Sequence, residues 1–358
     1  MRLKHFSIIL LLVATSLFLG GCSGAGAMAN NWPGITIDQD TVYVAYAGEV
    51  MAVRLSDGSL VWRFPEKVES GRTYYAAPAV SDGLLVVGDY AGTLHALDAA
   101  SGVQKWSFTP QVKSGNAARF VGSALIHQDM ILAPTAGHDS LYAVSLTGKE
   151  LWRFPTGQAI WAQPVSDGER VYIASMDHYL YAVRLVDHQQ VWKKDLGAAL
   201  VAAPVLADGT LYLGTLGNEM IAVSADGEIL WRYTTDGAIW SSPVLVEGTL
   251  YFGDASGSIY AVDVTSGTGR WKIDLSSGAI TGSGAVVSGN LVFSSENGSL
   301  VAVGLDGRRL WTQTIQGKLY TGPAVSDDKI VVAITQGDQL LKALDSNGNE
   351  LWSFVPPK

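Results

Sequence analysis

Short hydrophobic runs separated by turn residues repeat along most of the chain. In the stretch 243–273, apolar and β-branched residues form four runs, and Glu-Gly, Ser-Gly and Ser-Gly-Thr-Gly signals separate them. Alternation with a period of two, broken by glycine-containing links, is typical of antiparallel strands joined by hairpins. We therefore predict four strands in each unit of about 40 residues. After residue 21, no segment shows a sustained amphipathic helical pattern.

The unit occurs eight times, each time with a tryptophan near its end. An alanine followed by Val or Leu lies nine or ten residues before each tryptophan, and in seven units a glycine stands between them. The fourth unit has Asp187-His188 in place of that glycine. The eight tryptophans are Trp62, Trp106, Trp152, Trp192, Trp231, Trp271, Trp311 and Trp352.

Eight units of four strands predict an all-β fold, a single eight-bladed β-propeller over residues 32–358 with four antiparallel strands per blade. The strand-like residues 35–37 open the first unit, and residues 350–354 close the eighth. Because both ends are in phase with the repeat, we expect little or no exchange of strands where the ring closes.

The repeat has the form Tyr-Ala-Val-Asp-x-x-Ser-Gly-x-x-x-Trp at residues 260–271, with close variants at 95–106 and 181–192. This pattern resembles the PQQ-like (quinoprotein-type) β-propeller repeat family. The resemblance implies that each repeat tryptophan docks its blade against the neighbouring blade. It also implies that the repeat alanine is small enough to let strands and blades approach closely.

The N-terminus has the features of an export signal. Arg2 and Lys4 precede an apolar run over residues 6–19, which is shorter than the roughly 20 residues of a membrane span. The sequence Leu-Gly-Gly-Cys then ends at Cys22, the only cysteine of the chain. This looks like a bacterial lipobox, which implies a lipoprotein signal peptide at 1–21, lipid attachment at Cys22 and a lipidated tether at 22–31. The alternative is an ordinary signal peptide with a cysteine at its end.

Composition narrows the function classes. Hydrophobic residues make up 48% of the chain and charged residues 16%, so it can bury a large core. With 24 Lys and Arg against 33 Asp and Glu, the net charge is −9 and no basic block is present. Such a chain is a poor candidate for nucleic-acid binding. A single cysteine excludes a disulfide framework and a multi-cysteine metal site.

No catalytic constellation stands out. Quinoprotein dehydrogenases of the resembling family are longer and carry an adjacent cysteine pair, a calcium-binding set and an aspartate base, and we find no such set here. No nucleophile elbow, P-loop or His-Glu-x-x-His motif occurs. His138-Asp139 and Asp177-His178 could form a metal site, but solvated turns are the favoured interpretation. We predict no enzyme activity, no catalytic residues, no cofactor and no metal.

One position just before each innermost strand is rich in aromatic residues and should ring the mouth of the central channel. These residues could cap the core between blades, or they could bind a peptide or another ligand. The eight positions are Trp32, Tyr75, Phe120, Trp161, Val201, Trp240, Thr281 and Tyr320.

Two connections between neighbouring units are longer than the others, and they follow Trp62 and Trp106. They carry four cations on an otherwise acidic chain, and insertions on one face of a repeat fold often mark its binding face. We therefore predict a partner surface beside the first three blades. The four cations are Lys67, Arg72, Lys113 and Arg119.

Together these features predict a non-catalytic, monomeric propeller, anchored through lipid on Cys22, that acts as a protein-interaction scaffold in the bacterial cell envelope. If the cell has an outer membrane, the resemblance implies a periplasmic location and, as partner, the periplasmic part of the outer-membrane β-barrel assembly machinery. Otherwise the protein would lie on the outer face of the plasma membrane. The alternative is a module that binds a glycan or peptide on its aromatic ring, and a quinone-dependent oxidoreductase is a less favoured third reading.

Overall fold

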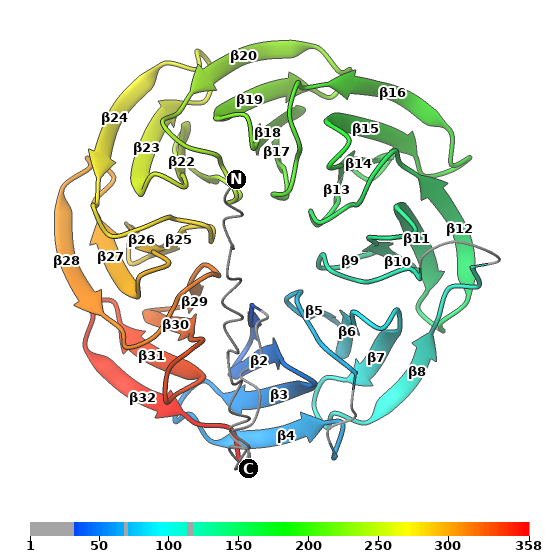
Figure 1. Cartoon of the computed structure of the whole chain (residues 1–358), viewed down its shortest axis with the longest axis horizontal. Helices are drawn as coiled ribbons and strands as arrows, with labels where there is room; N and C mark the ends of the chain where they lie inside the picture. The colour runs from blue at the N-terminus through cyan, green and yellow to red at the C-terminus, as the bar shows by residue number, and fades with distance from the viewer. Residues whose placement is uncertain (1–31, 68–70, 113–116, 358) are drawn as a thin grey trace, which may run out of the picture.

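A computed structural model describes residues 32–67, 71–112 and 117–357 of the chain. Over these residues 32 strands form eight four-stranded sheets, arranged as blades around a central channel (Figure 1). The predicted eight-bladed propeller is confirmed. Within the same described ranges, no helix is long and apolar enough to cross a membrane.

Each blade consists of four strands that are consecutive in the chain. The strands of blades one to four are β1 (Gly34–Asp38), β2 (Thr41–Tyr46), β3 (Glu49–Arg54), β4 (Leu60–Phe64), β5 (Ala79–Ser81), β6 (Leu84–Gly88), β7 (Leu94–Asp98), β8 (Gln104–Phe108), β9 (Leu125–His127), β10 (Met130–Pro134), β11 (Ser140–Ser145), β12 (Glu150–Pro155), β13 (Val165–Ser166), β14 (Arg170–Ala174), β15 (Tyr179–Arg184) and β16 (Gln190–Asp195). Those of blades five to eight are β17 (Val205–Ala207), β18 (Thr210–Gly214), β19 (Glu219–Ser224), β20 (Ile229–Thr234), β21 (Val244–Val246), β22 (Thr249–Gly253), β23 (Ser258–Asp263), β24 (Gly269–Asp274), β25 (Ala285–Val287), β26 (Asn290–Ser294), β27 (Ser299–Val303), β28 (Arg309–Thr314), β29 (Ala324–Ser326), β30 (Lys329–Ala333), β31 (Leu341–Asp345) and β32 (Glu350–Phe354).

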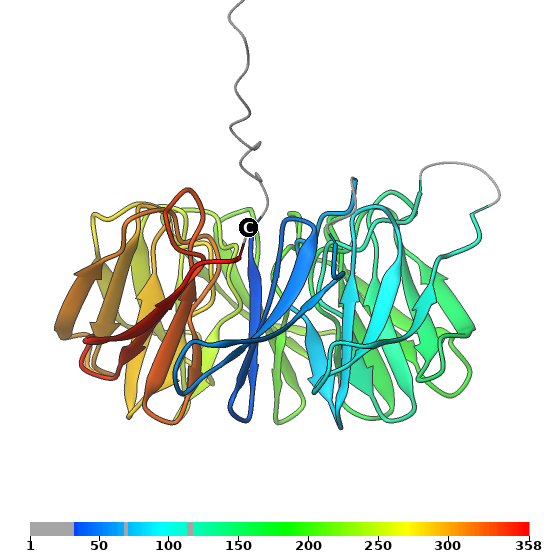
Figure 2. The same cartoon turned by 90° about the horizontal axis from the view of Figure 1, so that it is seen from below.

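The position of a strand in its blade explains its composition. The first strand lies nearest the channel and the fourth forms the outer rim (Figure 1). In blade six, β22 and β23 are buried along almost their whole length, whereas β24 alternates between exposed and half-buried residues. The two middle strands have a neighbouring strand at each edge and a blade on each face, so they read as continuous apolar runs. Figure 2 shows the blades standing side by side in a single layer.

The repeat alanine and the repeat tryptophan lie opposite each other on the third and fourth strands. Ala261 pairs with Trp271 in blade six, and Ala52 pairs with Trp62 in blade one. The other six blades have the same pairing, and in every blade the register shifts directly after the alanine. Such a bulge bends the outer strand. The spacing between alanine and tryptophan in the repeat therefore reflects the register in which the third and fourth strands pair.

Seven of the eight tryptophans dock on the next blade through a hydrogen bond. Their indole N–H donates to a backbone carbonyl in the turn between the third and fourth strands of that blade, over 2.8–3.0 Å. The turn glycine lies under the same indole: a Cβ atom on Gly102, for example, would come within 2.6 Å of the Trp62 ring. The glycine is thus needed for a φ of +72° and also for the space that the indole fills.

The unit without a turn glycine docks differently. His188 occupies the turn of blade four, and Trp152 of blade three stacks on its ring at 4.8 Å with an interplanar angle of 22°. The Trp152 Nε1 atom is buried without a hydrogen-bond partner. A ring-on-ring contact therefore replaces the indole-on-glycine contact at this one boundary. The eight repeat tryptophans thus contact the next blade in two ways, seven over a turn residue with a hydrogen bond and Trp152 over the His188 ring.

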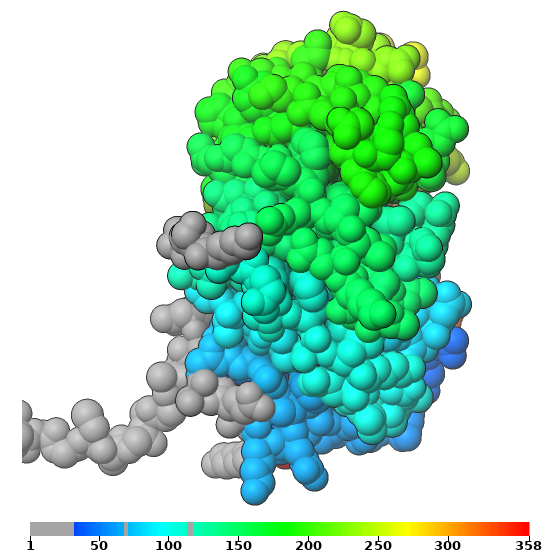
Figure 3. Space-filling view, turned by 90° about the vertical axis from the view of Figure 1, so that its right-hand side faces the viewer, coloured from blue at the N-terminus to red at the C-terminus, as the bar shows by residue number. Residues whose placement is uncertain are grey.

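Side chains close the ring. Trp352 of the last strand donates its indole N–H to the carbonyl of Leu55 in blade one, 2.8 Å away and 297 residues earlier in the chain. Trp352 and Phe354 share one core cluster with Val42 and Val44 of β2. Because every sheet contains only consecutive strands, the expected absence of strand exchange is confirmed. Figure 3 shows the blades following one another in chain order around the rim.

Backbone hydrogen bonds define the two faces of the propeller. The connections between blades bond to the turns between second and third strands, as from Tyr74 N to Ala47 O and from Ile160 N to Thr135 O. We call this side the crossover face. On the opposite face, the Arg170 guanidinium donates to the carbonyl of Ala225. This bond joins a turn between first and second strands to a turn between third and fourth strands. This is the arrangement expected from the repeat.

Some predicted features lie outside the described residues. They are the signal peptide at 1–21, the tether at 22–31 with the lipid attachment site Cys22, and the cation Lys113 in the second long connection. They remain predictions from the sequence.

Candidate functional site

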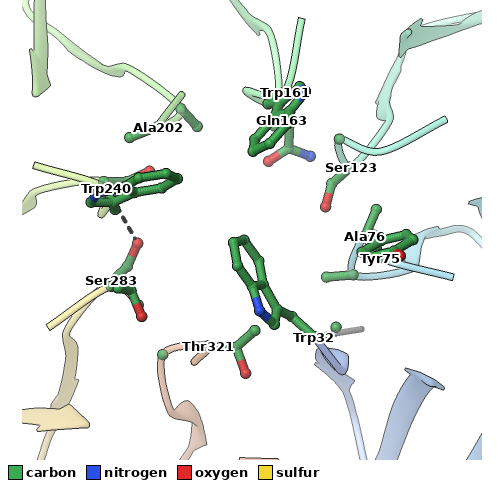
Figure 4. A pocket seen from close by; sticks show the side chains of 18 of the residues that line it. Trp32, Tyr75, Ala76, Ser123, Trp161, Gln163, Ala202, Trp240, Ser283 and Thr321 are labelled. Atoms are coloured by element: carbon green, nitrogen blue, oxygen red, sulfur yellow. Dashed lines mark hydrogen bonds between the residues drawn. The ribbon is translucent and has the colours of Figure 1, made fainter. Parts of the chain in front are cut away.

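The inner strands leave a cavity of about 380 Å³ where the channel opens on the crossover face. Residues that precede the innermost strand of each of the eight blades line this cavity, and Figure 4 shows several of them pointing toward its centre. Seven of the eight predicted ring residues line it. The ring observed in the structure consists of Trp32, Tyr75, Val121, Trp161, Val201, Trp240, Thr281 and Tyr320.

Phe120 is the exception, and its predicted place in the ring is wrong. Its side chain has no exposed surface and belongs to the core shared by blades two and three. A Cβ atom on Gly88, the last residue of β6, would come within 2.1 Å of the Phe120 Cβ, so the phenylalanine packs directly on that glycine. Val121 takes the ring position instead.

The error is a shift of one residue, and the sequence contains a signal that corrects it. In five units a proline follows the ring residue at the third position, as Pro164 follows Trp161. In blade three, Ala124 stands at the position of that proline, and counting back three residues from Ala124 gives Val121. The residue before each ring position is then apolar and fully buried in seven blades; these residues are Tyr74, Phe120, Ile160, Leu200, Ile239, Ile280 and Leu319.

Trp32 fills one side of the mouth. Its ring stacks on Tyr320 of blade eight at 5.9 Å and meets Trp240 of blade six edge-on at 6.5 Å. Trp32 still keeps 38% of its surface exposed. Aromatic pairs of these geometries are worth about 0.5–1.5 kcal/mol beyond the area they bury. Trp32 is thus held against blades six and eight.

The other side of the mouth is more open. Trp161 is 36% exposed, and among the described residues no other aromatic ring packs against it. Ser123 and Gln163 lie beside it in the same view (Figure 4). Gln163 is held by a hydrogen bond from its Nε2 to the carbonyl of Ala124, 2.8 Å away. An indole face and two polar groups therefore border the unfilled part of the cavity.

The cavity wall is polar but uncharged. Over the part of the chain that the structure describes, no Asp, Glu, Lys, Arg or His lines it. Ser283 Oγ accepts a hydrogen bond from the Ser242 amide at 3.0 Å, and Thr281 Oγ1 donates to the Tyr320 carbonyl at 2.8 Å. The Thr321 hydroxyl is buried and has no hydrogen-bond partner. These groups suit a ligand that carries neutral hydrogen-bonding groups.

A second cluster, half-buried except at Tyr90, extends from the mouth across blades two and three. Tyr75 packs on Tyr90 at 5.3 Å, and the Arg119 guanidinium lies over the Tyr90 ring at 4.8 Å. Tyr90 is 40% exposed. Sequence reasoning missed Tyr90, although it is the bulky residue of the turn Asp-Tyr-Ala-Gly at 89–92, where a small polar residue would suffice.

Arg72 is not one of the exposed charges, contrary to the sequence-based expectation. Its side chain is only 14% exposed and forms an ion pair with Asp89, with Nε and Oδ2 3.6 Å apart. Asp89 is itself buried and bonds to His95 Nε2 at 2.9 Å. Burial alone would raise the pKa of the Asp89 carboxyl, but hydrogen bonds from His95 and the backbone amide of Thr93 outweigh it and hold that pKa below its usual value. Lys67 is exposed on the first long connection.

Comparison with known proteins identifies the family. A family model described as "Outer membrane protein assembly factor BamB" matches residues 29–141, 137–303 and 255–357. Together these matches span nearly all of the repeat region. The chain belongs to the BamB family.

Individual members of the BamB family are distant relatives of this chain. The proteins named outer membrane protein assembly factor BamB from Moranella endobia and Yersinia pestis are each 26% identical, over 58% and 55% of the chain. These alignments cover 55% and 51% of the relatives, so the chain spans about half the length of each. The crystal structure of BamB from Moraxella catarrhalis superposes with a TM-score of 0.72 at 17% identity, covering 86% of this chain and 92% of that one. At this identity the superposition shows a common fold.

The BamB-family repeat also occurs in an enzyme. A quinohemoprotein alcohol dehydrogenase from Comamonas testosteroni is 22% identical over 54% of this chain, but the match covers only 23% of the enzyme. The match therefore shows a shared repeat.

Hydrogen bonds within the protein hold the two histidine–aspartate turns. His138 Nδ1 is 2.7 Å from the Tyr142 hydroxyl, and the Tyr181 hydroxyl and the Gly157 amide both donate to Asp177 Oδ2. In the described ranges, no group of three or more His, Cys, Asp or Glu side chains could hold a metal ion. These side chains order their own turns.

Proposed function

We propose that this chain is a lipid-anchored, non-catalytic scaffold that takes part in the assembly of outer-membrane β-barrel proteins. The observation that carries the proposal is the match of the BamB family model, which runs through all eight blades. The proposed location is the periplasmic side of the outer membrane, and the proposed partner is the periplasmic part of the barrel-assembly machinery. We propose that the propeller acts there as a monomer.

The cluster of Tyr75, Arg119 and the exposed Tyr90 supports a docking role for the crossover face. Tyrosine and arginine are enriched among the residues that dominate the energy of protein interfaces. The three side chains already contact one another, so a partner would meet a pre-ordered surface and would lose less side-chain entropy on binding. Lys67 adds an exposed cation on the neighbouring connection. On an acidic chain, these cations would steer a partner with negative charge.

Lipid attachment at Cys22 is tested separately. In the full-length chain expressed in a cell with an outer membrane, Cys22→Ala should move the protein from the detergent phase to the aqueous phase on phase partitioning. The reason is that the mature chain would lose its acyl groups, each contributing about 0.8 kcal/mol per buried CH₂. Partitioning that is unchanged in Cys22→Ala would contradict the anchor, whereas the docking proposal would stand.

The docking surface is tested with Tyr90→Ala and Arg119→Glu. We expect the double variant to weaken binding to the immobilised periplasmic part of the barrel-assembly machinery of the same organism by about ten-fold or more, measured by surface plasmon resonance. Tyr90→Ala should mainly raise the dissociation rate, because it removes buried contact area. Arg119→Glu should mainly lower the association rate, with a larger effect at low salt.

Matched variants on the opposite face serve as controls. Val186→Ala changes a residue that is 82% exposed, and Arg308→Glu reverses an exposed charge in a turn between third and fourth strands. Both should leave binding within about two-fold of the wild-type chain. If these variants abolish binding while the Tyr90 and Arg119 variants do not, the docking face has been assigned wrongly. If the wild-type chain does not bind the machinery at all, the proposed function is wrong.

A further inference from the structure

The channel mouth is a concave site that the proposed docking surface does not use, apart from Tyr75 at its edge. Its cavity of about 380 Å³ falls within the range of about 300–1,000 Å³ that small-molecule sites occupy. Three tryptophans and two tyrosines line it, drawn from five different blades. A cavity that merely completed the core would bury these rings, yet Trp32 and Trp161 each keep more than a third of their surface exposed.

Three polar groups of the mouth are not satisfied by the protein. Within the described residues, the Ser123 hydroxyl, the Gln163 Oε1 atom and the Thr321 hydroxyl make no hydrogen bond. The Thr321 hydroxyl is also buried, and a buried polar atom without a partner destabilises a fold by about 1–3 kcal/mol. Ser123 and Gln163 lie beside the open face of Trp161 (Figure 4). A ligand on that face could therefore stack on the indole and bond to the amide and the hydroxyl at once.

The chemistry of the wall selects one class of ligand. Because no charged side chain lines the described part of the cavity, burying an anion or a cation there would leave its charge unpaired. A purely apolar ligand would leave the hydroxyl and amide groups without partners. Neutral saccharides have the matching combination, since the C–H face of a pyranose packs on an indole and its hydroxyls both donate and accept hydrogen bonds.

We propose that the channel mouth binds a neutral saccharide, with one sugar ring stacked on Trp161 and its hydroxyls bonded to Ser123 and Gln163. Trp32 forms the opposite wall, held in place by Tyr320 and Trp240. This activity is independent of the proposed docking function, because neither Tyr90 nor Arg119 takes part in it.

The proposal is tested by isothermal titration of the full chain in detergent with three neutral trisaccharides: triacetylchitotriose, maltotriose and cellotriose. At least one should bind with a Kd of about 1 mM or tighter, and the anionic trimer of galacturonic acid should not bind measurably. Trp161→Ala should weaken the binding by about ten-fold or more, because it removes the stacking face. The exposure of Trp161 makes the fold tolerant of this change, and an unchanged melting temperature confirms it. If the fold is lost, Ser123→Ala provides the same test with a smaller expected loss of about three-fold.

Val186→Ala on the opposite face is the control, and saccharide binding should be unchanged in it. The proposal is overturned if none of the three trisaccharides binds the wild-type chain, or if binding survives both Trp161→Ala and Ser123→Ala. Acetyltryptophan amide is titrated in parallel. If that compound binds and the saccharides do not, the mouth is a receptor for aromatic side chains and the saccharide assignment is wrong. Binding of the machinery by the Tyr90 and Arg119 surface would be unaffected by either result.

Discussion

Trp352→Ala is expected to lower the free energy of unfolding by about 3–5 kcal/mol, the usual cost of truncating a large buried aromatic side chain. Only 9% of the Trp352 surface is exposed, and its indole N–H bonds to the carbonyl of Leu55 at 2.8 Å. This contact joins the last blade to the first, and within residues 32–357 as described no strand is exchanged there. The substitution removes the indole, the hydrogen bond and the packing on Gly58 together. Urea unfolding followed by circular dichroism measures the loss.

The neighbouring residue supplies the control. Leu351 lies on the same strand but points outward with 47% of its surface exposed. Leu351→Ala should change the free energy of unfolding by no more than about 0.5 kcal/mol. Equal losses in the two variants would mean that the ring does not depend on Trp352 for its closure.

Gly58→Ala is expected to have the second largest effect, a loss of about 2–4 kcal/mol, because it adds a steric clash to an unfavourable backbone conformation. Gly58 has a φ of +73°, and a Cβ there would lie 2.7 Å from the Trp352 ring. Gly83 has a φ of +74° with nothing within 4 Å of the added Cβ. Gly83→Ala should therefore carry only the backbone cost of about 1–2 kcal/mol.

The comparison of the two alanine variants isolates the role of the indole. Both are measured by urea unfolding, and the difference between their free energies of unfolding reports the contact with Trp352 alone. A difference close to zero would show that the turn glycine serves only the backbone conformation. Its place beneath the docking tryptophan would then be incidental.

Much of the fold follows from the sequence because the contacts that define a blade are local. The strands of one blade are consecutive, so the spacing from Ala261 to Trp271 is also the register of their cross-strand pair. Hairpin glycines and apolar runs mark each strand within about 40 residues. Counting the tryptophans therefore yields the number of blades. The one missing turn glycine, at Asp187-His188, marks the boundary where Trp152 stacks on His188 instead, although the sequence analysis did not predict this difference.

The candidate site was only partly predictable because it is built from irregular connections. A crossover has no two-residue period, so only the distance to the following proline or its equivalent, Ala124, distinguishes Phe120 from Val121, and a shift of one residue exchanges a core position for a cavity position. The pairing of Arg72 with Asp89 was hidden for a similar reason. Arg72 lies in the connection that leads into blade two and Asp89 lies in a turn of that blade, so their contact depends on how the connection packs on the turn.

The sequence by itself determined the repeat, the number of blades, the docking tryptophans and the place of the aromatic ring at the channel mouth. Only the tertiary structure decided which aromatic residues meet there. Trp32, Trp240 and Tyr320 are far apart in the chain. Trp32 meets Tyr320 because the first blade closes against the last, and it meets Trp240 of blade six because its ring points into the mouth that all the blades surround. Strand patterns arise from interactions between near neighbours in the chain, whereas the contents of a central cavity depend on eight blades being assembled around it.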